Sequence, residues 1–391
     1  MKTQNKCVVV RFGELTLKGK NRDFFEKSLL DDIRNHLIFS NLDFKIEKDR
    51  NRIYIFGEDL KKIQEELFFV AGIKSTSCCY VCEKNIDSIF ECVKQVILEK
   101  DIKNCVVMID VKRSDKSFSM QSPELGKEIC SRIEREFPER NIVFSFHNYS
   151  RKIFIEIQPK YALVFDEKIQ HLGGLPINTA GKGLLLLSGG IDSSVAGILA
   201  MRRGIAVDSI FFDTLDDEFF YSKLIILAKR LRKFCLSMKL FYVPYFKFFE
   251  YVFNQMNNRE LKYGCLICKR GMFYLSSKLA KRIGAELLIT GENLSQVASQ
   301  TLQNMICISK ITDYLVLRPL ICYDKEEIIN YSKFLRIHDV INIKSEKKCI
   351  LLHDHPVTRA ALDEVVKLEN KLNTYKFLDL IFESIKEVDL N

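Results

Sequence analysis

One short segment combines small residues, hydroxyl groups and a carboxylate in an order suited to anion binding. Its sequence is Ser188-Gly189-Gly190-Ile191-Asp192-Ser193-Ser194, and it lies between the apolar segment Leu184–Leu187 and a predicted helix at Val195–Arg203. Glycines let the backbone approach an anion closely, and the N-terminus of a helix offers N–H donors with a partial positive charge. The serine hydroxyl groups would add donors. The segment therefore predicts a phosphate-binding loop.

Two details narrow the ligand of this loop. The glycines are accompanied neither by a Lys-Ser/Thr pair nor by a G-x-G-x-x-G pattern, so the loop differs from the Walker loop and from the dinucleotide fingerprint. Pyrophosphate is then the more natural ligand. Asp192 would repel a phosphate placed against it, and its charge is more consistent with holding Mg²⁺ or orienting the loop. The alternative interpretation is a tight strand-to-helix turn with small residues for packing.

A second chemical feature is the pair Cys265 and Cys268, separated by two residues at the head of a predicted helix that extends to Ile283. Two thiolates at this spacing can face one metal or cluster, or they can form a redox dithiol. A zinc ion would need four ligands and could recruit His353 or His355. The remaining clustered or isolated cysteines are interpreted as packing residues, namely Cys78, Cys79, Cys82, Cys235, Cys307 and Cys322.

The elements that must position these residues are apolar strands alternating with helices. After residue 183 the predicted strands are Leu184–Leu187, Ala206–Phe212, Leu240–Val243 and Glu286–Ile289. This alternation is typical of a doubly wound parallel sheet with helices on both faces. Ligands of such folds bind beyond the carboxyl ends of the strands. We therefore expect the loops after Leu187, Phe212 and Thr290 to face one site.

Two smaller α+β blocks precede the glycine-rich stretch His171–Gly183, where we expect a domain boundary. The first is predicted to contain strand Cys7–Arg11, helix Arg22–Leu37, strands Asp43–Ile46 and Arg52–Phe56, and helix Leu60–Phe69. This βαββα order fits a small ferredoxin-like domain. The second is predicted to contain strand Cys105–Val111, a helix with Ser122 as N-cap and Pro123 at its first position, and strands Ile142–Phe144 and Ile153–Ile157.

Composition sets broader limits. The chain has 391 residues, of which 47% are hydrophobic and 28% charged, enough for two or three globular domains. The apolar run near the N-terminus, Cys7–Val10, is too short for a signal peptide or a membrane span, so we expect a cytoplasmic protein with no membrane association. Its 13 cysteines are then expected to be reduced thiols. The net charge of +9 suits a polyanionic partner but is weak evidence alone.

The phosphate loop resembles the S-G-G-x-D-S signature of the PP-loop ATP pyrophosphatases, and nearly the whole chain is similar to the tRNA 4-thiouridine synthetase (ThiI) family. Further motifs carry this resemblance in the family's order. They are Arg11–Leu15 with Leu17–Arg22, Val111–Phe118, Gly173–Pro176, Thr290–Glu292 with Gln296–Thr301, Leu317–Leu320, and His355–Arg359.

The resemblance implies an organisation and a set of ligands. It implies an N-terminal ferredoxin-like domain at 1–60, a THUMP RNA-binding domain at 61–170, a linker at 171–182 and a PP-loop domain at 183–391. It also implies homodimerisation, and it places tRNA on the first two domains. Short basic loops there could contact phosphates, and their candidate residues are Lys18, Lys20, Arg22, Lys112, Arg113 and Lys116.

The same resemblance implies ATP and Mg²⁺ at the PP-loop. The ATP contacts would come from the loop and the strand end before it, from an aromatic wall, and from three further residues. These residues are Leu186, Leu187, Ser188–Ser194, Phe211, Phe212, Arg270, Gly291 and Gln296. Buried strand packing is the alternative for Phe211 and Phe212, and we expect at least one of them to follow it.

For sulfur chemistry, the resemblance assigns a catalytic role to Cys349. Many family members carry a rhodanese-like domain with a persulfide-bearing cysteine, which this chain lacks up to Asn391. It instead has the CxxC pair, as in rhodanese-free members that hold an iron–sulfur cluster. We therefore expect Cys265, Cys268 and Cys349 to ligate three irons of a [4Fe–4S] cluster whose fourth iron binds sulfide. Zinc, or a persulfide on Cys349 supplied by a cysteine desulfurase, remain alternatives.

The expected activity is adenylation of uridine 8 of tRNA followed by replacement of its carbonyl oxygen with sulfur. Asp192 and the three cysteines would be the catalytic residues. Thiolation of another base, a PP-loop ligase that uses ammonia or acts on a small molecule, and an RNA-binding module with a degenerate nucleotide site are the competing hypotheses. The intact loop sequence disfavours the last of these. A role in thiamine synthesis depends on the absent rhodanese-like domain and is not expected.

Overall fold

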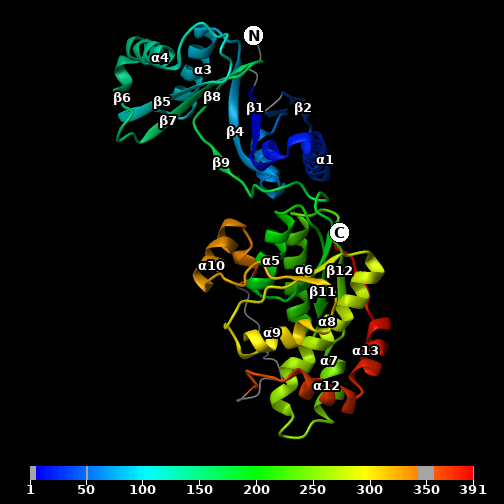
Figure 1. The fold of residues 1–391 in the computed structure, drawn as a ribbon. Helices are drawn as coiled ribbons and strands as arrows, with labels where there is room; N and C mark the ends of the chain where they lie inside the picture. The colour runs from blue at the N-terminus through cyan, green and yellow to red at the C-terminus, as the bar shows by residue number, and fades with distance from the viewer. Residues whose placement is uncertain (1–5, 50–51, 342–355, 391) are drawn as a thin grey trace. The chain divides into compact units, whose positions relative to one another are not determined.

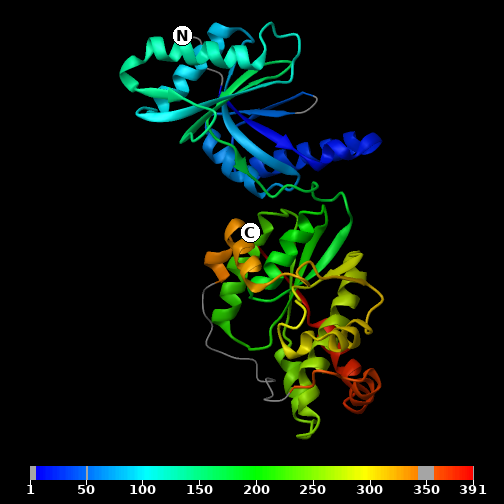
Figure 2. The same cartoon turned by 60° about the vertical axis from the view of Figure 1, so that its left-hand side comes forward.

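The computed structural model describes residues 6–49, 52–341 and 356–390. The chain divides into two compact units, Met1–Gly174 and Leu175–Asn391. Figure 1 shows a sheet in each unit, and Figure 2 shows the same elements from a second direction. No helix in the described ranges is long and apolar enough to cross a bilayer.

The described residues of the first unit form a nine-stranded sheet in the order β2-β3-β1-β4-β8-β7-β5-β6, with β9 paired to β4. Its strands are β1 (Lys6–Phe12), β2 (Lys45–Lys48), β3 (Ile53–Phe56), β4 (Ile73–Cys82), β5 (Cys105–Arg113), β6 (Ile142–Phe144), β7 (Arg151–Ile157), β8 (Ala162–Phe165) and β9 (Ile169–Gln170). Its helices are α1 (Arg22–Phe39), α2 (Leu60–Glu66), α3 (Ile86–Glu99) and α4 (Ser122–Glu136).

The long strand β4 joins the ferredoxin-like and THUMP segments into this one sheet. It pairs with β1 over Ile73–Tyr80 and with β8 over Tyr80–Cys82, both antiparallel. Along β7, Ile153, Ile155 and Ile157 are fully buried and belong to the core that includes residues of α3 and α4. The predicted βαββα order of the first block is present. The predicted N-cap of α4 is wrong by one residue, because Gln121 forms the capping box with Glu124.

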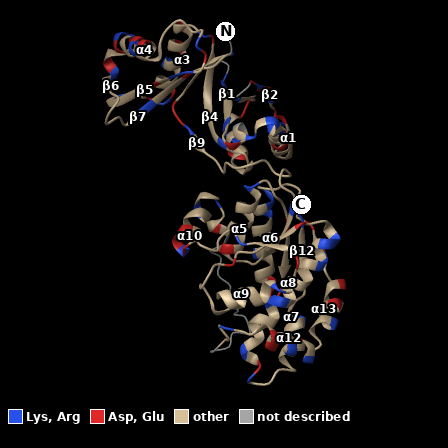
Figure 3. Cartoon of the chain, in the orientation of Figure 1, with Lys and Arg blue, Asp and Glu red and all other residues tan. Residues whose placement is uncertain are grey.

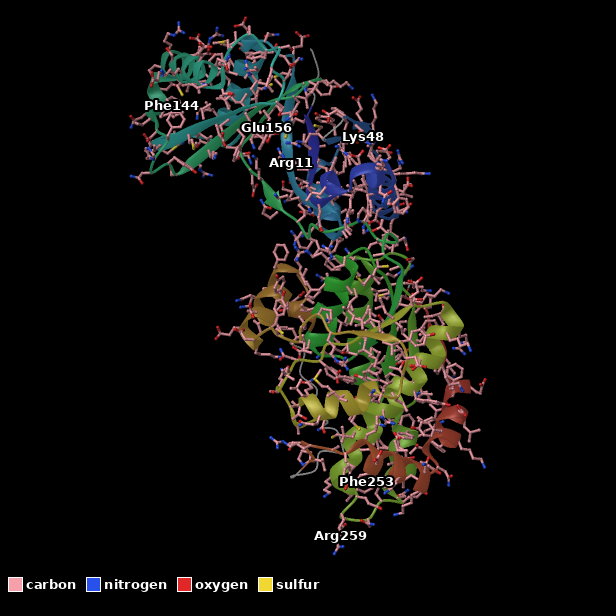
Figure 4. The ribbon with its side chains drawn as sticks, in the orientation of Figure 1. Arg11, Lys48, Phe144, Glu156, Phe253 and Arg259 are labelled. Carbon is pink, nitrogen blue, oxygen red and sulfur yellow. The ribbon has the colours of Figure 1, made fainter. Side chains whose placement is uncertain are left out.

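A buried charge cluster lies where strands of the two segments meet. Glu156 is only 2% exposed, and Arg11 Nη2, Arg52 Nη2 and Lys168 Nζ lie 3.2, 3.4 and 3.5 Å from its carboxylate oxygens. Burial raises the pKa of Glu156, but the charges of Arg11, Arg52 and Lys168 outweigh burial and leave that pKa lowered. Figure 4 labels Arg11 and Glu156 within this unit. The cluster ties β1 and β7 together electrostatically.

On each side of the boundary after Gly174, the chain is hydrogen-bonded within its own unit. The N–H groups of His171 and Gly173 donate to the carbonyls of Lys74 and Ile73 in the first unit. Leu175 N–H donates to the carbonyl of Arg202 in the second. Gly173 and Gly174 have φ values of +67° and +81°, which glycine adopts without strain.

The second unit has a six-stranded sheet in the order β14-β13-β10-β11-β12-β15 within its described residues. The strands are β10 (Lys182–Leu187), β11 (Ala206–Phe212), β12 (Leu240–Val243), β13 (Leu287–Ile289), β14 (Leu315–Leu317) and β15 (Lys386–Val388), of which only β15 is antiparallel to its neighbour. The helices are α5 (Ile191–Met201), α6 (Glu218–Arg232), α7 (Phe246–Phe253), α8 (Gly264–Ile283), α9 (Leu302–Ser309), α10 (Lys325–Phe334), α11 (His338–Ile341), α12 (Leu362–Lys371) and α13 (Thr374–Glu383).

Strand β10 marks the topological switch point of this sheet. The chain continues from β10 to β11 on one side, and later returns to place β13 on the other side. Ligand sites of open α/β sheets lie beyond the carboxyl end of the strand at such a point. The predicted α/β fold class, with two α+β parts before the doubly wound domain, is confirmed. The helix after β10 begins at Ile191 rather than at the predicted Val195, so Asp192, Ser193 and Ser194 lie in its first turn.

Replacing Glu156 should test the charge cluster directly. Glu156→Ala leaves three neighbouring cations without their buried carboxylate, which costs about 3–5 kcal/mol when such a pair is broken. We expect urea unfolding of the full chain to show that loss in the transition of the first unit. Glu139→Ala, at an exposed position, is the control and should change the unfolding free energy by less than about 0.5 kcal/mol. Equal behaviour of the two variants would contradict a structural role for the cluster.

Candidate functional site

The loop after β10 is organised by its own serines. Ser193 Oγ accepts a hydrogen bond from Ser188 N–H at 3.0 Å and lies 3.0 Å from both Ser188 Oγ and Ser188 O. Ser194 is fully buried, and its hydroxyl donates to the carbonyl of Gly190 at 2.9 Å. Gly190 is the N-cap of α5 and has no side chain with which to cap the first N–H groups. The helix N-terminus therefore keeps donors available for an anion.

Phe220 of α6 covers one of the loop glycines. A Cβ atom on Gly189 would lie 2.7 Å from Cζ of the Phe220 ring, a distance that real side chains do not reach. A side chain at position 189 would therefore displace the aromatic ring that packs on the loop. The strand residues just before it differ in burial, with Leu187 buried and Leu186 partly buried against the core.

The loop after β13 approaches the segment Ser188–Ser194 even more closely than Phe220 does. A Cβ atom on Gly291 would lie 2.3 Å from Ser193 N and 2.5 Å from the carbonyl carbon of Asp192. Any side chain at position 291 would displace backbone, which cannot yield as a flexible side chain can. Gly291 thus joins the loops after β10 and β13 at the switch point. This fits the prediction that loops after these strands face one site.

Asp192 is paired with a lysine that the sequence reasoning missed. Lys325 Nζ donates to Asp192 Oδ1 at 2.8 Å and to Oδ2 at 3.0 Å. Lys325 is the first residue of α10, whose N-cap Asp324 forms a capping box with Glu327. The D-K-E-E sequence signals a helix start, but the partner of Lys325 lies 133 positions away. The predicted Mg²⁺ role of Asp192 stays a prediction.

The other predicted ATP residues lie in different surroundings. Phe211 and Phe212 are 2% and 7% exposed, and their rings pack near Phe220 and Tyr245 respectively. Both follow strand packing, as we expected for at least one of them. Gln296 is exposed. A role of these three in nucleotide binding stays a prediction.

Arg270 is engaged in the core of the second unit. Its Nε and Nη2 atoms donate to the two carboxylate oxygens of Glu369 at 2.7 and 2.9 Å, and Nη1 donates to the carbonyl of Cys307. Both charged residues are nearly inaccessible. This fork pairs one guanidinium with one carboxylate, so the structure gives Arg270 a packing role within α8 and α12. Its predicted phosphate contact stays a prediction.

Glu292 connects the site to the head of α8. It follows Gly291, is 6% exposed, and accepts hydrogen bonds from Lys269 Nζ at 3.0 Å and Arg318 Nε at 2.9 Å. Lys269 directly follows Cys268. Lys269 and Arg318 thus share one buried carboxylate. Figure 3 shows how Lys and Arg residues are distributed over each unit. The sequence did not single out Glu292, although this residue ends the Thr290–Glu292 motif.

The two cysteines of the CxxC pair lie in the first turns of α8. Cys265 is partly buried and Cys268 is buried, and the carbonyl of Cys268 accepts a hydrogen bond from Tyr245 OH at 2.8 Å. Cys349 lies outside the described residues. Within the described ranges, no group of three or more His, Cys, Asp or Glu residues could hold a metal ion. The predicted cluster ligands therefore stay a prediction.

The segment that follows position 355 is fixed beside the CxxC pair. Val357 N–H donates to the carbonyl of Lys262, three residues before Cys265. The fully buried Asn304 donates to the carbonyls of Val357 and Ala298 at 2.8 Å and accepts from Ala360 N–H at 3.1 Å. The Q-V-A-S-Q-T-L-Q-N motif thus holds the P-V-T-R-A segment near the head of α8.

The predicted tRNA residues all lie in the first unit. Lys20, Lys112 and Lys116 are exposed. Lys18 lies over the Phe25 ring at 5.0 Å, Arg22 pairs with Glu26 at 2.6 Å, and Arg113 donates to the carbonyls of Phe118 and Met120. Arg113 therefore closes its own loop, whereas the exposed lysines are available to a polyanion. Their RNA contacts stay a prediction.

Three family models match the chain in order. They are the ThiI ferredoxin-like domain over residues 7–77, the THUMP domain over 83–166, and "Thiamine biosynthesis protein (ThiI)" over 178–374. A "Probable tRNA sulfurtransferase" of Halothermothrix orenii is 38% identical over 377 residues, which cover 94% of each chain. One of Acholeplasma laidlawii is 33% identical, covering 98% of this chain and 92% of its own.

The solved structures agree with these matches. A 4-thiouridine synthetase in complex with RNA and with bound ATP is similar at a TM-score of 0.85 and 28% identity, covering 99% of this chain and all of its own. A protein from Pyrococcus horikoshii shares the fold at a TM-score of 0.66 and 24% identity, covering 85% of this chain and 99% of its own.

Gly291→Ala should weaken nucleotide binding. The added methyl group must displace the backbone of Asp192 or Ser193, and overpacking of this kind costs about 1–3 kcal/mol. Calorimetric titration with ATP should show this cost as weaker binding, with about a tenfold loss of affinity for each 1.4 kcal/mol of binding free energy that is lost. Gly126→Ala, where the nearest atom to the new Cβ is at 3.6 Å, is the control. Unchanged ATP affinity in a folded Gly291→Ala variant would rule out the tight contact.

Proposed function

Because the chain belongs to the ThiI family, we propose that it is an ATP-dependent tRNA sulfurtransferase that converts uridine 8 of tRNA to 4-thiouridine. The observation that carries the proposal is the contact of two loops at the switch point, where Gly291 touches the start of α5 and Glu292 pairs with Lys269 beside Cys268. An anion site and a thiol pair are thereby held in one region of the second unit. That combination suits an enzyme that activates with ATP and then transfers sulfur.

The first step would occur at the loop Ser188–Ser194. The O4 atom of uracil attacks the α-phosphorus of ATP, the bond between that phosphorus and the α,β-bridging oxygen breaks, and pyrophosphate leaves with the electron pair of that bond. The N–H groups at the start of α5 would stabilise the charge on the departing pyrophosphate. Asp192 would hold Mg²⁺, an ion that prefers carboxylate and phosphate oxygens. Lys325, which pairs with Asp192, would contact the same phosphates.

The second step replaces oxygen by sulfur. Adenylation makes O4 a good leaving group, so a sulfur nucleophile forms the C4–S bond while the C4–O bond breaks and AMP departs. The target base must leave its stack to reach the loop. The first unit would hold the tRNA, with Lys18, Lys20, Arg22, Lys112, Arg113 and Lys116 as the proposed phosphate contacts.

Cys265, Cys268 and Cys349 would hold a [4Fe–4S] cluster, which when bound supplies an iron with an open position for sulfide. Cys265 and Cys268 lie within the first turns of α8, where one is partly buried and the other buried, and such low exposure suits a cluster. Cys349 stands seven positions before Pro356 in the sequence, and Val357, the residue after Pro356, is bonded beside the CxxC pair through the carbonyl of Lys262. A persulfide on Cys349, delivered by a cysteine desulfurase, is the second candidate route.

Cytoplasmic location and homodimerisation belong to the proposal as well. Reduced thiols and a tRNA substrate suit the cytoplasm. The dimer is carried over from the family alone.

Anaerobic reconstitution tests the proposal. Purified chain, ATP, Mg²⁺, sulfide and unmodified tRNA should yield 4-thiouridine, measured by mass spectrometry of digested nucleosides. Cys265→Ala, Cys268→Ala and Cys349→Ala should abolish thiolation yet retain pyrophosphate release, because the adenylation loop is untouched. Cys78→Ala, an exposed cysteine in the first unit, is the matched control and should keep full activity.

The outcomes separate the candidate routes. Iron and acid-labile sulfide that disappear in all three variants support the cluster. Full thiolation by iron-free protein contradicts the cluster, and dependence on a desulfurase then favours the persulfide. Failure to release pyrophosphate with any tRNA would overturn the sulfurtransferase proposal itself.

A further inference from the structure

Two cationic side chains pair with the single carboxylate of Glu292, so its negative charge balances only one of them. Lys269 Nζ and Arg318 Nε lie 3.0 and 2.9 Å from its two carboxylate oxygens, and the side chains of all three are largely covered, at 26%, 13% and 8% exposure for Lys269, Arg318 and Glu292. Burial raises the pKa of Glu292, but the charges of Lys269 and Arg318 outweigh burial and lower it overall, so the carboxylate is ionised at neutral pH. The group therefore has one excess positive charge.

The neighbouring residue on the same helix shows the contrast. Arg270 pairs with Glu369 through two parallel hydrogen bonds, one cation with one carboxylate, and its third contact is the carbonyl of Cys307. That guanidinium is fixed and balanced. Lys269 has a flexible stem, and its ammonium group donates a hydrogen bond to an oxygen of the shared carboxylate. Arg318, by comparison, has a second partner in Ser309 Oγ at 2.7 Å.

The excess charge lies between the two parts of the proposed reaction. Gly291, the residue before Glu292, touches the backbone of Asp192 and Ser193 in the phosphate loop. On the other side, Lys269 directly follows Cys268 in α8. A nucleotide phosphate bound at the start of α5 would therefore lie close to Lys269, which could exchange its bond to the Glu292 carboxylate for a bond to the phosphate.

We propose that Lys269 binds a phosphate oxygen of the nucleotide, and that Glu292 holds Lys269 in position before the nucleotide arrives and competes with it. The inference rests on the proposed function, and it adds a phosphate-contacting residue to the activating site. When the C4–O bond breaks, its electron pair moves to the oxygen of AMP, which gains negative charge. A cation already placed beside that oxygen stabilises the departing group without reorganisation.

The first test is the binding of AMP to the full-length chain by calorimetry. Lys269→Met keeps the stem and removes the charge, and should weaken AMP binding by about 10- to 100-fold, the range for a charge-assisted hydrogen bond. Lys269→Arg should recover part of the affinity. Lys281→Met, an exposed lysine near the other end of α8, is the matched control and should bind AMP as the unchanged protein does. Equal AMP affinity of Lys269→Met and the control would overturn the proposal.

Glu292→Gln should change the affinity for AMP in the opposite direction, which a purely structural role of Glu292 would not predict. Glutamine keeps the shape and an acceptor, but it removes the negative charge that competes with phosphate. AMP should bind more tightly than to the unchanged protein, by about three- to tenfold, and with a steeper dependence on salt. The melting temperature should fall because two buried cations lose their counter-charge. Weaker or unchanged AMP binding by folded Glu292→Gln contradicts the competition, and Lys269→Met still decides the contact if Glu292→Gln does not fold.

This assay is independent of tRNA and of sulfur. Loss of AMP binding in Lys269→Met together with failed thiolation by the unchanged protein would support the phosphate contact and reject the proposed overall reaction. Normal thiolation by the unchanged protein together with unaltered AMP binding in Lys269→Met would support the proposed overall reaction and reject the phosphate contact of Lys269.

Discussion

The contact of Gly291 with the backbone of Asp192 and Ser193 determines how the second unit can work. Strands β10 and β13 are parallel neighbours, so their carboxyl ends meet at the same edge of the sheet. The missing side chain at 291 lets the two loops touch there. Once they touch, Asp192 can reach Lys325 of α10, and Glu292 can reach Lys269 of α8. The loop after β10, the head of α8 and the segment around Arg318 are therefore held by one small group of contacts.

Some of the ion pairs in the second unit are balanced and others have excess positive charge, and the excess lies where the proposed reaction would bring phosphate groups. Deep in the unit, Arg270 and Glu369 form a closed pair, which is costly to break and suits a fixed scaffold. At the edge of the sheet, Asp192 pairs with a half-exposed lysine, and Glu292 is shared by two cations. The partly exposed Asp192–Lys325 pair contributes little stability and exchanges partners easily, and the buried Glu292 has two cations for one negative charge. A phosphate-rich ligand is the natural partner for the cations that they release.

The first unit follows a different principle. Its long strand β4 carries both segments in one sheet, and the buried Glu156 with Arg11, Arg52 and Lys168 holds the join. A charge cluster at that position cannot slide without exposing an unpaired carboxylate, so it favours one register of the strands. The lysines that face solvent remain free of this structural task.

Local sequence patterns predicted the elements well and the long-range pairs poorly. Ala206–Phe212, Leu240–Val243 and Ile142–Phe144 have the bounds of β11, β12 and β6, because short segments rich in β-branched and aromatic residues favour strands. The start of α5 was misplaced because Ile191 and Asp192 are helical despite lying in a glycine-rich loop. The Asp192–Lys325 and Glu292–Lys269 pairs depend on strand order, which one sequence does not specify. Arg270 and Lys269 are adjacent in sequence, and only helix orientation shows which one lies in the core.

The path of the uridine oxygen tests the central claim most directly. Unmodified tRNA carrying ¹⁸O at C4 of uridine 8 would be incubated anaerobically with the full chain, ATP, Mg²⁺ and sulfide, and the products analysed by mass spectrometry. Adenylation at the loop after β10 followed by displacement predicts that each 4-thiouridine formed is matched by one AMP bearing ¹⁸O. Label found in inorganic phosphate or in water, with unlabelled AMP, would contradict activation of the base by adenylation.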